Sequence, residues 1–349
     1  MEDLLLHLLP YLDFKTVLNC HQVSQKWSEL IDKNKRFWIR ELQALKFEKI
    51  YFSTHFRFNR GKTIVDVFPD WQEVFEYFEK SVETEKLKDF VCALQAPYEY
   101  LRSETDGKRL SEILNPMHIE AMRGRHKLIQ ILVESPMNFN SQTIPNDDDG
   151  DYMGKNTILH IACNNGDTEL VKFILSHFKD KKINVDITNC NDCNPFQVAC
   201  LYGDSIGVQS SKDKIDKSFG LTLSHKEVIK YFLQNSSEFG IDVNAPVLWT
   251  GEHPLTLLSS WGIRSEDYSE LLQEFLKHKD FVVPDIIVDS DVPESFRKNE
   301  HELQPLLVNC LKAKKTLLDC LNKPNPTAKD ILKRVAEDLD IDIPFKKIR

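Results

Sequence analysis

The sequence predicts an all-α protein that is built from several helical units. Apolar residues recur at the three- and four-residue spacing of amphipathic helices over the first 45 residues, and again between residues 71 and 94. From about residue 107, short apolar segments recur in pairs, each opened by a turn. A chain of 349 residues suits two or three such units better than one compact core.

The amino-acid composition of the chain excludes some classes of binding partner. The net charge is −9 and basic residues form no stripe, so we expect neither nucleic acid nor an anionic membrane as a partner. No stretch reaches the roughly 20 apolar residues of a spanning helix, and the N-terminus lacks the features of a signal peptide. Eight scattered cysteines favour a reducing compartment, so we expect a cytoplasmic location, with a nuclear location as the alternative.

The first 45 residues carry more apolar surface than a segment of that size can bury. The leucines Leu4, Leu5, Leu8, Leu9 and Leu12 share one helical stripe, and later residues up to Leu45 add further apolar faces. Because a short segment has a high ratio of surface to volume, it cannot cover these faces alone. The segment therefore needs a partner.

The order of residues in this segment resembles the F-box, three short helices that insert into the Skp adaptor of cullin-based ubiquitin ligases. The acidic residue Asp3, the leucine-rich helix, the Leu12-Asp13 turn, the stretch 23–27 and the closing Trp38 all occur in order. The resemblance implies that residues 1–45 bind a Skp-type adaptor, and through it a cullin. The adaptor-binding residues that it implies are Leu4, Leu5, Leu8, Leu12, Leu18, Val23 and Trp27.

One departure from the F-box pattern leaves a second reading open. The family's usual Leu-Pro before the acidic residue is missing, and Met1 stands at or beside the proline position. Either the chain begins late or part of the adaptor contact is absent. The alternative is that these are simply the first helices of an all-α domain and fold onto their own neighbours.

Residues 46–104 are predicted to form a helical linker. Two apolar stripes run through 71–78 and 87–94, with Pro69-Asp70 and Ala96-Pro97 as expected breaks. We expect this linker to pack against the last helix of the F-box-like segment.

A repeated helix pair follows, and its clearest copy spans residues 155–175. Thr157 can cap a first helix, His160 can hydrogen-bond across the turn, and Gly166 can end that helix in the left-handed conformation. A second helix then buries the stripe Leu170, Val171, Ile174 and Leu175. This copy resembles an ankyrin repeat, with its Thr-Pro-Leu-His-x-Ala signature in about 33 residues.

Weaker copies of the same pattern begin near residues 115, 194, 253 and 304. The intervals between copies all exceed 33 residues, so each unit carries an insertion. The predicted array of about five repeats spans 105–322, with degenerate end repeats, and 323–349 are predicted to form a capping helix and tail. The largest insertion, 205–224, is expected to be a tolerated surface loop, the alternative being a partner-contacting loop or phosphorylation site.

Only one constellation has the spacing of metal ligands. It combines Cys190-x-x-Cys193 with His160-x-x-Cys163. The repeat already gives His160 and Cys163 structural roles and places Cys190 and Cys193 in a finger loop, so we expect no metal. The sequence also shows no catalytic signature, and we expect no cofactor and no enzymatic activity.

The two resemblances together imply the substrate-recognition subunit of a Skp–cullin–F-box ubiquitin ligase. The ankyrin surface would then bind a protein substrate that the sequence does not identify. Candidate contact residues are Tyr202, Trp249 and Trp261, although each is equally compatible with a place in the core. The alternatives are an ankyrin scaffold or inhibitor that acts without a ligase, and a decoy that occupies the adaptor without delivering a substrate.

Overall fold

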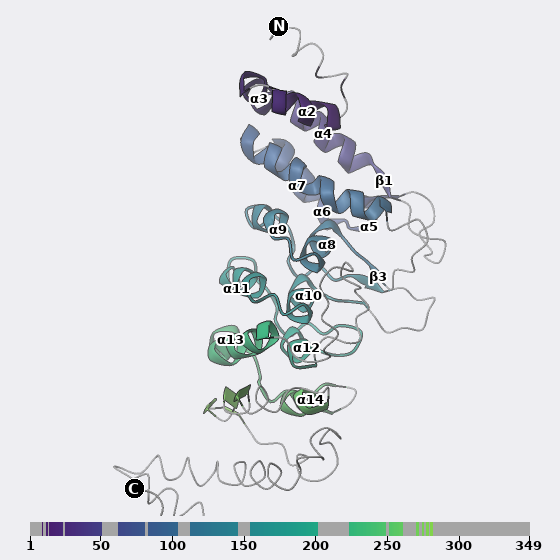
Figure 1. The fold of residues 1–349 in the computed structure, drawn as a ribbon. Helices are drawn as coiled ribbons and strands as arrows, with labels where there is room; N and C mark the ends of the chain where they lie inside the picture. The colour runs from purple at the N-terminus through teal and green to yellow at the C-terminus, as the bar shows by residue number, and fades with distance from the viewer. Residues whose placement is uncertain are drawn as a thin grey trace, which may run out of the picture. The chain divides into compact units, whose positions relative to one another are not determined.

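The computed structural model consists of helices and two very short pairs of strands (Figure 1). The structure describes residues 9, 12, 14–23, 25–50, 62–80, 83–103, 112–145, 154–201, 223–248, 251–260, 270–271, 274–275, 277–278 and 280–281. The chain divides into two compact units, the first made of Met1–Ala199 and Gly203–Lys217 and the second of Cys200–Tyr202 and Ser218–Arg349. The prediction of an all-α fold is confirmed.

The N-terminal helices of the first unit are α2 (Phe14–Val23), α3 (Gln25–Asp32) and α4 (Lys35–Phe47). Helix α4 begins at Asn34, whose side chain accepts a hydrogen bond from the backbone N–H of Phe37 at 3.1 Å. Trp38 is fully buried and its Nε1 donates to the carbonyl of Ile31 at 3.0 Å. Phe14 and Phe37 meet the Trp38 ring edge to face, so this tryptophan joins all three helices.

The next part of the chain forms a helical support between the N-terminal helices and the repeated pairs. Strands β1 (Lys49–Ile50) and β2 (Lys62–Thr63) pair antiparallel and lead into the helices α5 (Ile64–Val67), α6 (Asp70–Lys80) and α7 (Thr84–Ser103). Its core is aromatic: Phe78 and Phe90 stack with ring centroids 3.8 Å apart, and Phe75 meets Phe90 edge to face.

Helix α7 contacts α4 and also both helices of the first repeated pair. The expectation that the linker packs against the last N-terminal helix is therefore confirmed. The boundaries between the predicted domains remain predictions.

The expected break at Ala96-Pro97 is wrong, because α7 runs through Pro97 to Ser103. A proline inside a helix removes one backbone hydrogen bond and clashes with the preceding turn. Here the residues beyond the proline, Tyr98 and Leu101, are buried, with 1% and 3% of their surface exposed. Burial of this last turn offsets the local disadvantage of the proline.

The repeated pairs follow as predicted. In the first unit they are α8 (Pro116–Met122) with α9 (Lys127–Leu132), and α10 (Ile158–Asn164) with α11 (Thr168–Ser176). Strands β3 (Glu112–Ile113) and β4 (Ile144–Pro145) pair antiparallel beside the first pair, with Ile113 opposite Ile144. Gly124 and Gly166 end the first helix of each pair at φ 61° and 64°, the left-handed conformation that glycine adopts without strain.

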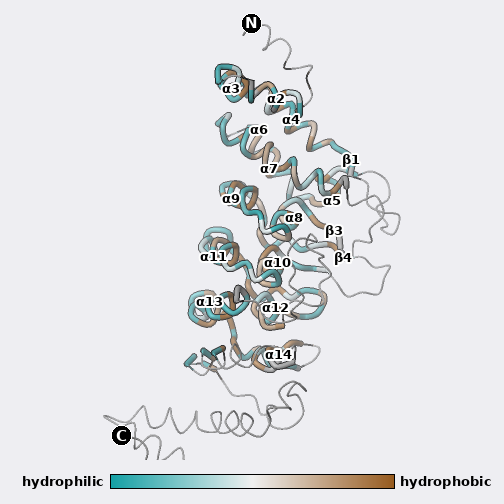
Figure 2. The backbone as a smooth tube through the Cα atoms, in the orientation of Figure 1, coloured by the Kyte–Doolittle hydropathy of each residue, from teal (hydrophilic) through white to brown (hydrophobic). Residues whose placement is uncertain are grey.

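Helix α12 (Pro195–Leu201) starts in the first unit, and the second unit contains α13 (Leu223–Phe239) and α14 (Pro254–Ser260). The helices carry hydrophobic and hydrophilic residues side by side, as amphipathic segments do (Figure 2). Of the insertion predicted at 205–224, residues 205–222 lie outside the described residues, and 223–224 already belong to α13. The last predicted repeat and the predicted C-terminal helix also lie outside them. No helix among the described residues is long and apolar enough to cross a membrane.

Truncation of Phe90 should destabilise the first unit strongly. Phe90 is completely buried between Phe75 and Phe78, so Phe90→Ala leaves a cavity and should lower the free energy of unfolding by about 3–5 kcal/mol. Chemical denaturation followed by tryptophan fluorescence measures this loss. Phe47→Ala is the control, because Phe47 is 62% exposed and should change stability little. A loss below about 1 kcal/mol for Phe90→Ala would contradict the packing described.

Candidate protein-binding surfaces

The first candidate surface comprises Leu9, Leu12 and the N-terminal helices α2, α3 and α4. Leu9 is buried and Leu12 is half-buried. Arg40 of α4 donates from Nη1 to the carbonyl of Leu9 at 2.8 Å and from Nη2 to the carbonyl of Leu12 at 3.2 Å. No sequence pattern indicated this role, because about 30 residues separate Arg40 from its partners and an arginine on a helix is usually solvated.

The structure describes only some of the predicted adaptor-binding residues. Leu18 and Val23 belong to α2, and Trp27 belongs to α3. Leu12 and Trp27 are half-buried. Leu4, Leu5 and Leu8 lie outside the described residues. The assignment of these residues to adaptor binding therefore stays a prediction.

The second candidate surface is the stack of helix pairs, which is held together by capping residues at the start of each first helix. Thr157 caps α10 together with His160: the Thr157 backbone N–H donates to His160 Nδ1 at 3.1 Å. The other ring nitrogen, Nε2, donates to the carbonyl of Cys193 at 3.0 Å, in the turn that opens the next pair. The roles predicted for Thr157 and His160 are confirmed.

In the neighbouring copies, different side chains cap the first helix. In the copy before, Asn115 caps α8, and Nε2 of His118 lies 3.1 Å from the carbonyl of Ser141. In the copy after, Asn194 and Gln197 replace the Thr157–His160 pair. The Gln197 side chain accepts from the Asn194 backbone at 2.8 Å, and the Asn194 side chain accepts from the Gln197 backbone at 2.9 Å.

Asparagine side chains connect the loops of successive pairs. Asn140 donates from Nδ2 to the carbonyl of Lys182 at 2.9 Å, and its Oδ1 accepts from the backbone N–H of Asn184 at 2.8 Å. Asn189 donates to the side chain of Asn156 at 3.1 Å. These contacts fix adjacent loops relative to each other. Sequence reasoning missed them, because asparagine in a loop also fits an ordinary local turn.

The opposite edge of the stack is tied by polar residues in the turns between helices. Nε2 of His126 lies 2.7 Å from the Asp167 carboxylate, which also caps α11 by accepting from the backbone N–H of Leu170. Asn165 donates to the carbonyl of Ala121 at 3.2 Å. Two neighbouring pairs are thus fixed at both ends.

Comparison with protein families matches both surfaces to known domains. A family model of F-box-like domains matches residues 2–41, and a model of ankyrin repeats matches residues 117–209 with three copies. The chain carries an F-box-like domain followed by ankyrin repeats. A search of curated proteins finds no significant match. Both matched families are typically non-catalytic interaction modules.

One loop of the second unit exposes a large hydrophobic side chain. Among the described residues, the large hydrophobic side chains that are exposed are Phe47 and Leu248, at 62% and 74%. Leu248 lies in a loop closed by a hydrogen bond from the Val247 backbone N–H to the Glu252 carbonyl at 2.9 Å. The predicted substrate-contacting residues Tyr202, Trp249 and Trp261 lie outside the described residues. Trp249 is the sequence neighbour of Leu248, so the loop remains a candidate contact point.

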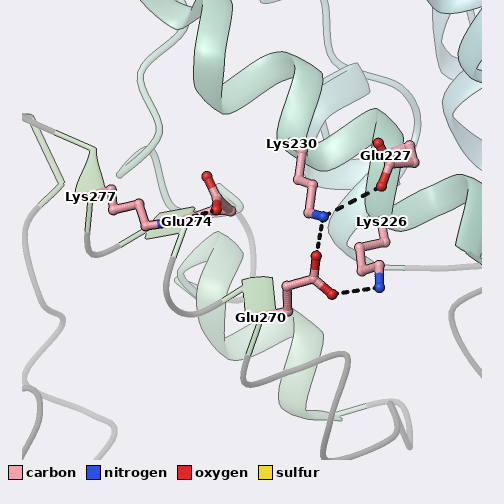
Figure 3. Close-up of polar contacts among 6 residues, drawn as sticks. All are labelled: Lys226, Glu227, Lys230, Glu270, Glu274 and Lys277. Carbon is pink, nitrogen blue, oxygen red and sulfur yellow. Dashed lines mark hydrogen bonds and ion pairs between the residues drawn. The ribbon is translucent and has the colours of Figure 1, made fainter.

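An ion-pair network joins elements of the second unit (Figure 3). Glu270 bonds Lys226 at 2.6 Å and also Lys230, and Lys230 pairs with Glu227 at 3.4 Å. Hydrogen bonds from Lys226 and Lys230 lower the pKa of Glu270 to about 2. Because Lys226 and Lys230 both lie on α13, the network attaches this helix to the segment that contains Glu270.

Residues with the spacing of metal ligands have structural roles in the repeat instead. Both ring nitrogens of His160 make hydrogen bonds within the stack, and the thiol of Cys193 donates to the carbonyl of Asn191 at 3.3 Å. In the part of the chain that the structure describes, no group of three or more His, Cys, Asp or Glu residues is arranged to hold a metal ion.

The buried histidines should make the ankyrin stack sensitive to acid. Burial lowers the pKa of both His118 and His160 from 6.5 to about 4. The unfolded chain therefore binds more protons than the folded chain between pH 6.5 and 4, so stability is full above pH 6.5 and falls as the pH drops through this window. Each histidine contributes up to about 3 kcal/mol to this loss. Thermal unfolding between pH 7.5 and 4.5 measures it.

Glutamine at position 160 provides a matched variant, because Gln197 occupies the equivalent position of the next repeat. We expect His160→Gln to fold and to lose less stability between pH 7 and 5 than the wild type does. Phe47→Ala, a change at an exposed residue that does not titrate, should leave the pH dependence unaltered. Equal acid sensitivity of His160→Gln and the wild type would rule out the buried imidazole as its source.

Proposed function

We propose that this protein is the substrate-recognition subunit of a Skp–cullin–F-box ubiquitin ligase. The F-box-like domain would bind a Skp-type adaptor and through it a cullin, and the ankyrin repeats would bind the protein substrate. The observation that carries the proposal is the order of the two modules together with the position of α7, which packs against α4 of the F-box-like domain and against the first ankyrin repeat. One helix thus supports both binding modules.

Charged and polar contacts reinforce this connection. Lys88 of α7 pairs with Asp32 of α3 at 2.7 Å, and Lys86 of α7 pairs with Glu134, just beyond α9. On α6, Asp70 accepts a hydrogen bond from Ser141 of the first repeat at 2.6 Å. Exposed ion pairs add little stability singly. Together with the apolar contacts of α7, they support a fixed geometry from the F-box-like domain to the first repeat.

A fixed geometry suits a receptor that acts by proximity. Such a protein breaks no bond itself and instead raises the effective concentration of its substrate near the conjugating enzyme. A stiff connection holds the bound substrate at one distance from the adaptor, whereas a flexible one would spread it over many distances. The proposal includes a cytoplasmic or nuclear location, where this ligase class acts.

One observation favours the alternative, a scaffold or inhibitor without a ligase. The apolar face of α4 is covered within the chain, since Trp38 and Leu42 are at most 1% exposed, so this helix also serves as the end of the helical stack. An N-terminal cap would need no adaptor. Adaptor binding is therefore the measurement that separates the two functions.

The full-length chain should bind a purified Skp-type adaptor in a biosensor or calorimetric titration. Leu8→Asp combined with Trp27→Ala should weaken binding at least about 30-fold, because apolar anchors at an interface typically contribute 2 kcal/mol or more. Leu248→Ser, a change at an exposed position in the ankyrin part, should leave adaptor affinity unchanged.

Two results would count against the proposal in different ways. If the folded wild-type chain does not bind the adaptor, the ligase function fails and the scaffold function becomes the better account. If the wild type binds but the double variant binds equally well, the predicted surface on the F-box-like domain is wrong.

A further inference from the structure

We propose that Arg40 is a positioning residue for the adaptor-binding surface, which it shapes by holding the backbone carbonyls of Leu9 and Leu12 beside α4. The inference rests on the proposed function, since it concerns the same surface. It adds a residue that lies outside the leucine-rich segment and outside the set of expected contacts.

The guanidinium of Arg40 uses three nitrogens at once. Nη1 donates to the carbonyl of Leu9 at 2.8 Å, and Nη2 donates to the carbonyl of Leu12 at 3.2 Å. Nε and Nη2 also donate to the Glu41 carboxylate, at 2.9 and 2.6 Å. One planar group thus donates to two carbonyls that are three residues apart in the sequence. Arginine is suited to this arrangement and lysine is not.

The backbone hydrogen bond to the Leu9 carbonyl is long. The Leu12 N–H reaches this carbonyl only at 3.4 Å, near the limit of a hydrogen bond. A backbone carbonyl oxygen carries partial negative charge, and a charged donor bonds it more strongly than a neutral one. Arg40 supplies such a donor at 2.8 Å, so it is the shorter of these two bonds to the Leu9 carbonyl.

Arg40 is itself held in place. Its guanidinium lies 5.0 Å from the centre of the Phe37 ring, and Glu41 fixes its outer edge. Phe37 packs against the buried Trp38, so the Phe37 ring holds the guanidinium beside the buried part of α4. The side chain of Arg40 is 34% exposed, which leaves it accessible at the surface without being a freely moving residue.

The consequence is preorganisation of the turn at Leu12, one of the predicted adaptor contacts. Leu9 is 1% exposed and anchors the segment in the core, whereas Leu12 stays half-buried. Fixing this backbone before the partner arrives reduces the conformational entropy that is lost on binding. Loss of Arg40 should therefore weaken adaptor binding without removing any predicted contact side chain.

The test compares Arg40→Ala and Arg40→Lys in the full-length chain, by titration with the purified Skp-type adaptor. Hydrogen bonds to charged groups are worth roughly 1.5–3 kcal/mol each, so we expect Arg40→Ala to raise the Kd about tenfold or more. Arg40→Lys keeps the charge but cannot grip both carbonyls, and should fall between Arg40→Ala and the wild type. Thermal unfolding confirms that each variant is folded. If Arg40→Ala does not fold, Arg40→Lys decides.

Two controls separate positioning from general charge effects. Arg36→Ala removes an exposed arginine from the same helix and should change the Kd less than twofold. Glu41→Gln removes the carboxylate charge but keeps a side-chain oxygen that can accept from Arg40, so the guanidinium stays in place and adaptor binding should stay near that of the wild type. Hydrogen exchange of the Leu12 amide, which donates to the Leu9 carbonyl, should accelerate in Arg40→Ala and stay unchanged in Arg36→Ala.

The outcomes distinguish this inference from the function on which it rests. A wild-type chain that does not bind the adaptor overturns the proposed function, and the role of Arg40 at an adaptor surface falls with it. A wild type that binds, together with an Arg40→Lys variant of equal affinity, overturns the positioning role and leaves the ligase function standing. Unchanged hydrogen exchange in a folded Arg40→Ala would overturn it as well.

Discussion

Each helical layer of this chain is too thin to bury its own apolar face, so it depends on the layers beside it. The first ankyrin repeat illustrates the constraint. Helices α8 and α9 together span few residues, yet Met117, Ile119, Leu128 and Ile129 are fully buried. Helix α7 covers them on one side, and α10 packs against α8 on the other. The aromatic core around Phe90 gives α7 the stability to serve as this support.

Stacking layers also buries backbone carbonyls and the polar side chains that cap the helices, and these groups need partners away from water. The repeats satisfy them with a small set of side chains whose positions recur. His160 bridges its own capping residue and the next turn, and Gln197 takes the same place one repeat later. A neutral imidazole fits this position because one nitrogen accepts while the other donates. The same burial that makes His160 useful makes its protonation unfavourable.

The protein thus combines a covered interior with two modules for which we propose different tasks. At the N-terminal end, the F-box-like helices share their apolar residues between the chain's own support and the proposed adaptor. Trp38 is committed to the interior, and Leu12 and Trp27 remain partly available. Arg40 differs from both the buried and the partly exposed apolar residues, because it is charged and half-buried. It acts on the main chain of the segment that carries Leu12.

The sequence by itself determined the features that depend on near neighbours in the chain. Thr157, His160 and Gly166 predicted where a helix begins and ends, because capping and left-handed turns involve residues only a few positions apart. The stripe from Leu170 to Leu175 predicted the buried face of α11 for the same reason. Motif order also predicted the F-box-like domain and the ankyrin repeats that the family comparison found.

Tertiary structure alone decided the features that depend on distant residues. Pro97 predicted a break that burial of Tyr98 and Leu101 overrides. The link from Asn140 to Asn184 spans 44 residues, and that from Arg40 to Leu9 spans 31. Asparagine and arginine carry no periodic pattern that points to such partners. A polar side chain can satisfy its hydrogen bonds equally well with water, and only the folded arrangement brings a particular carbonyl within its reach.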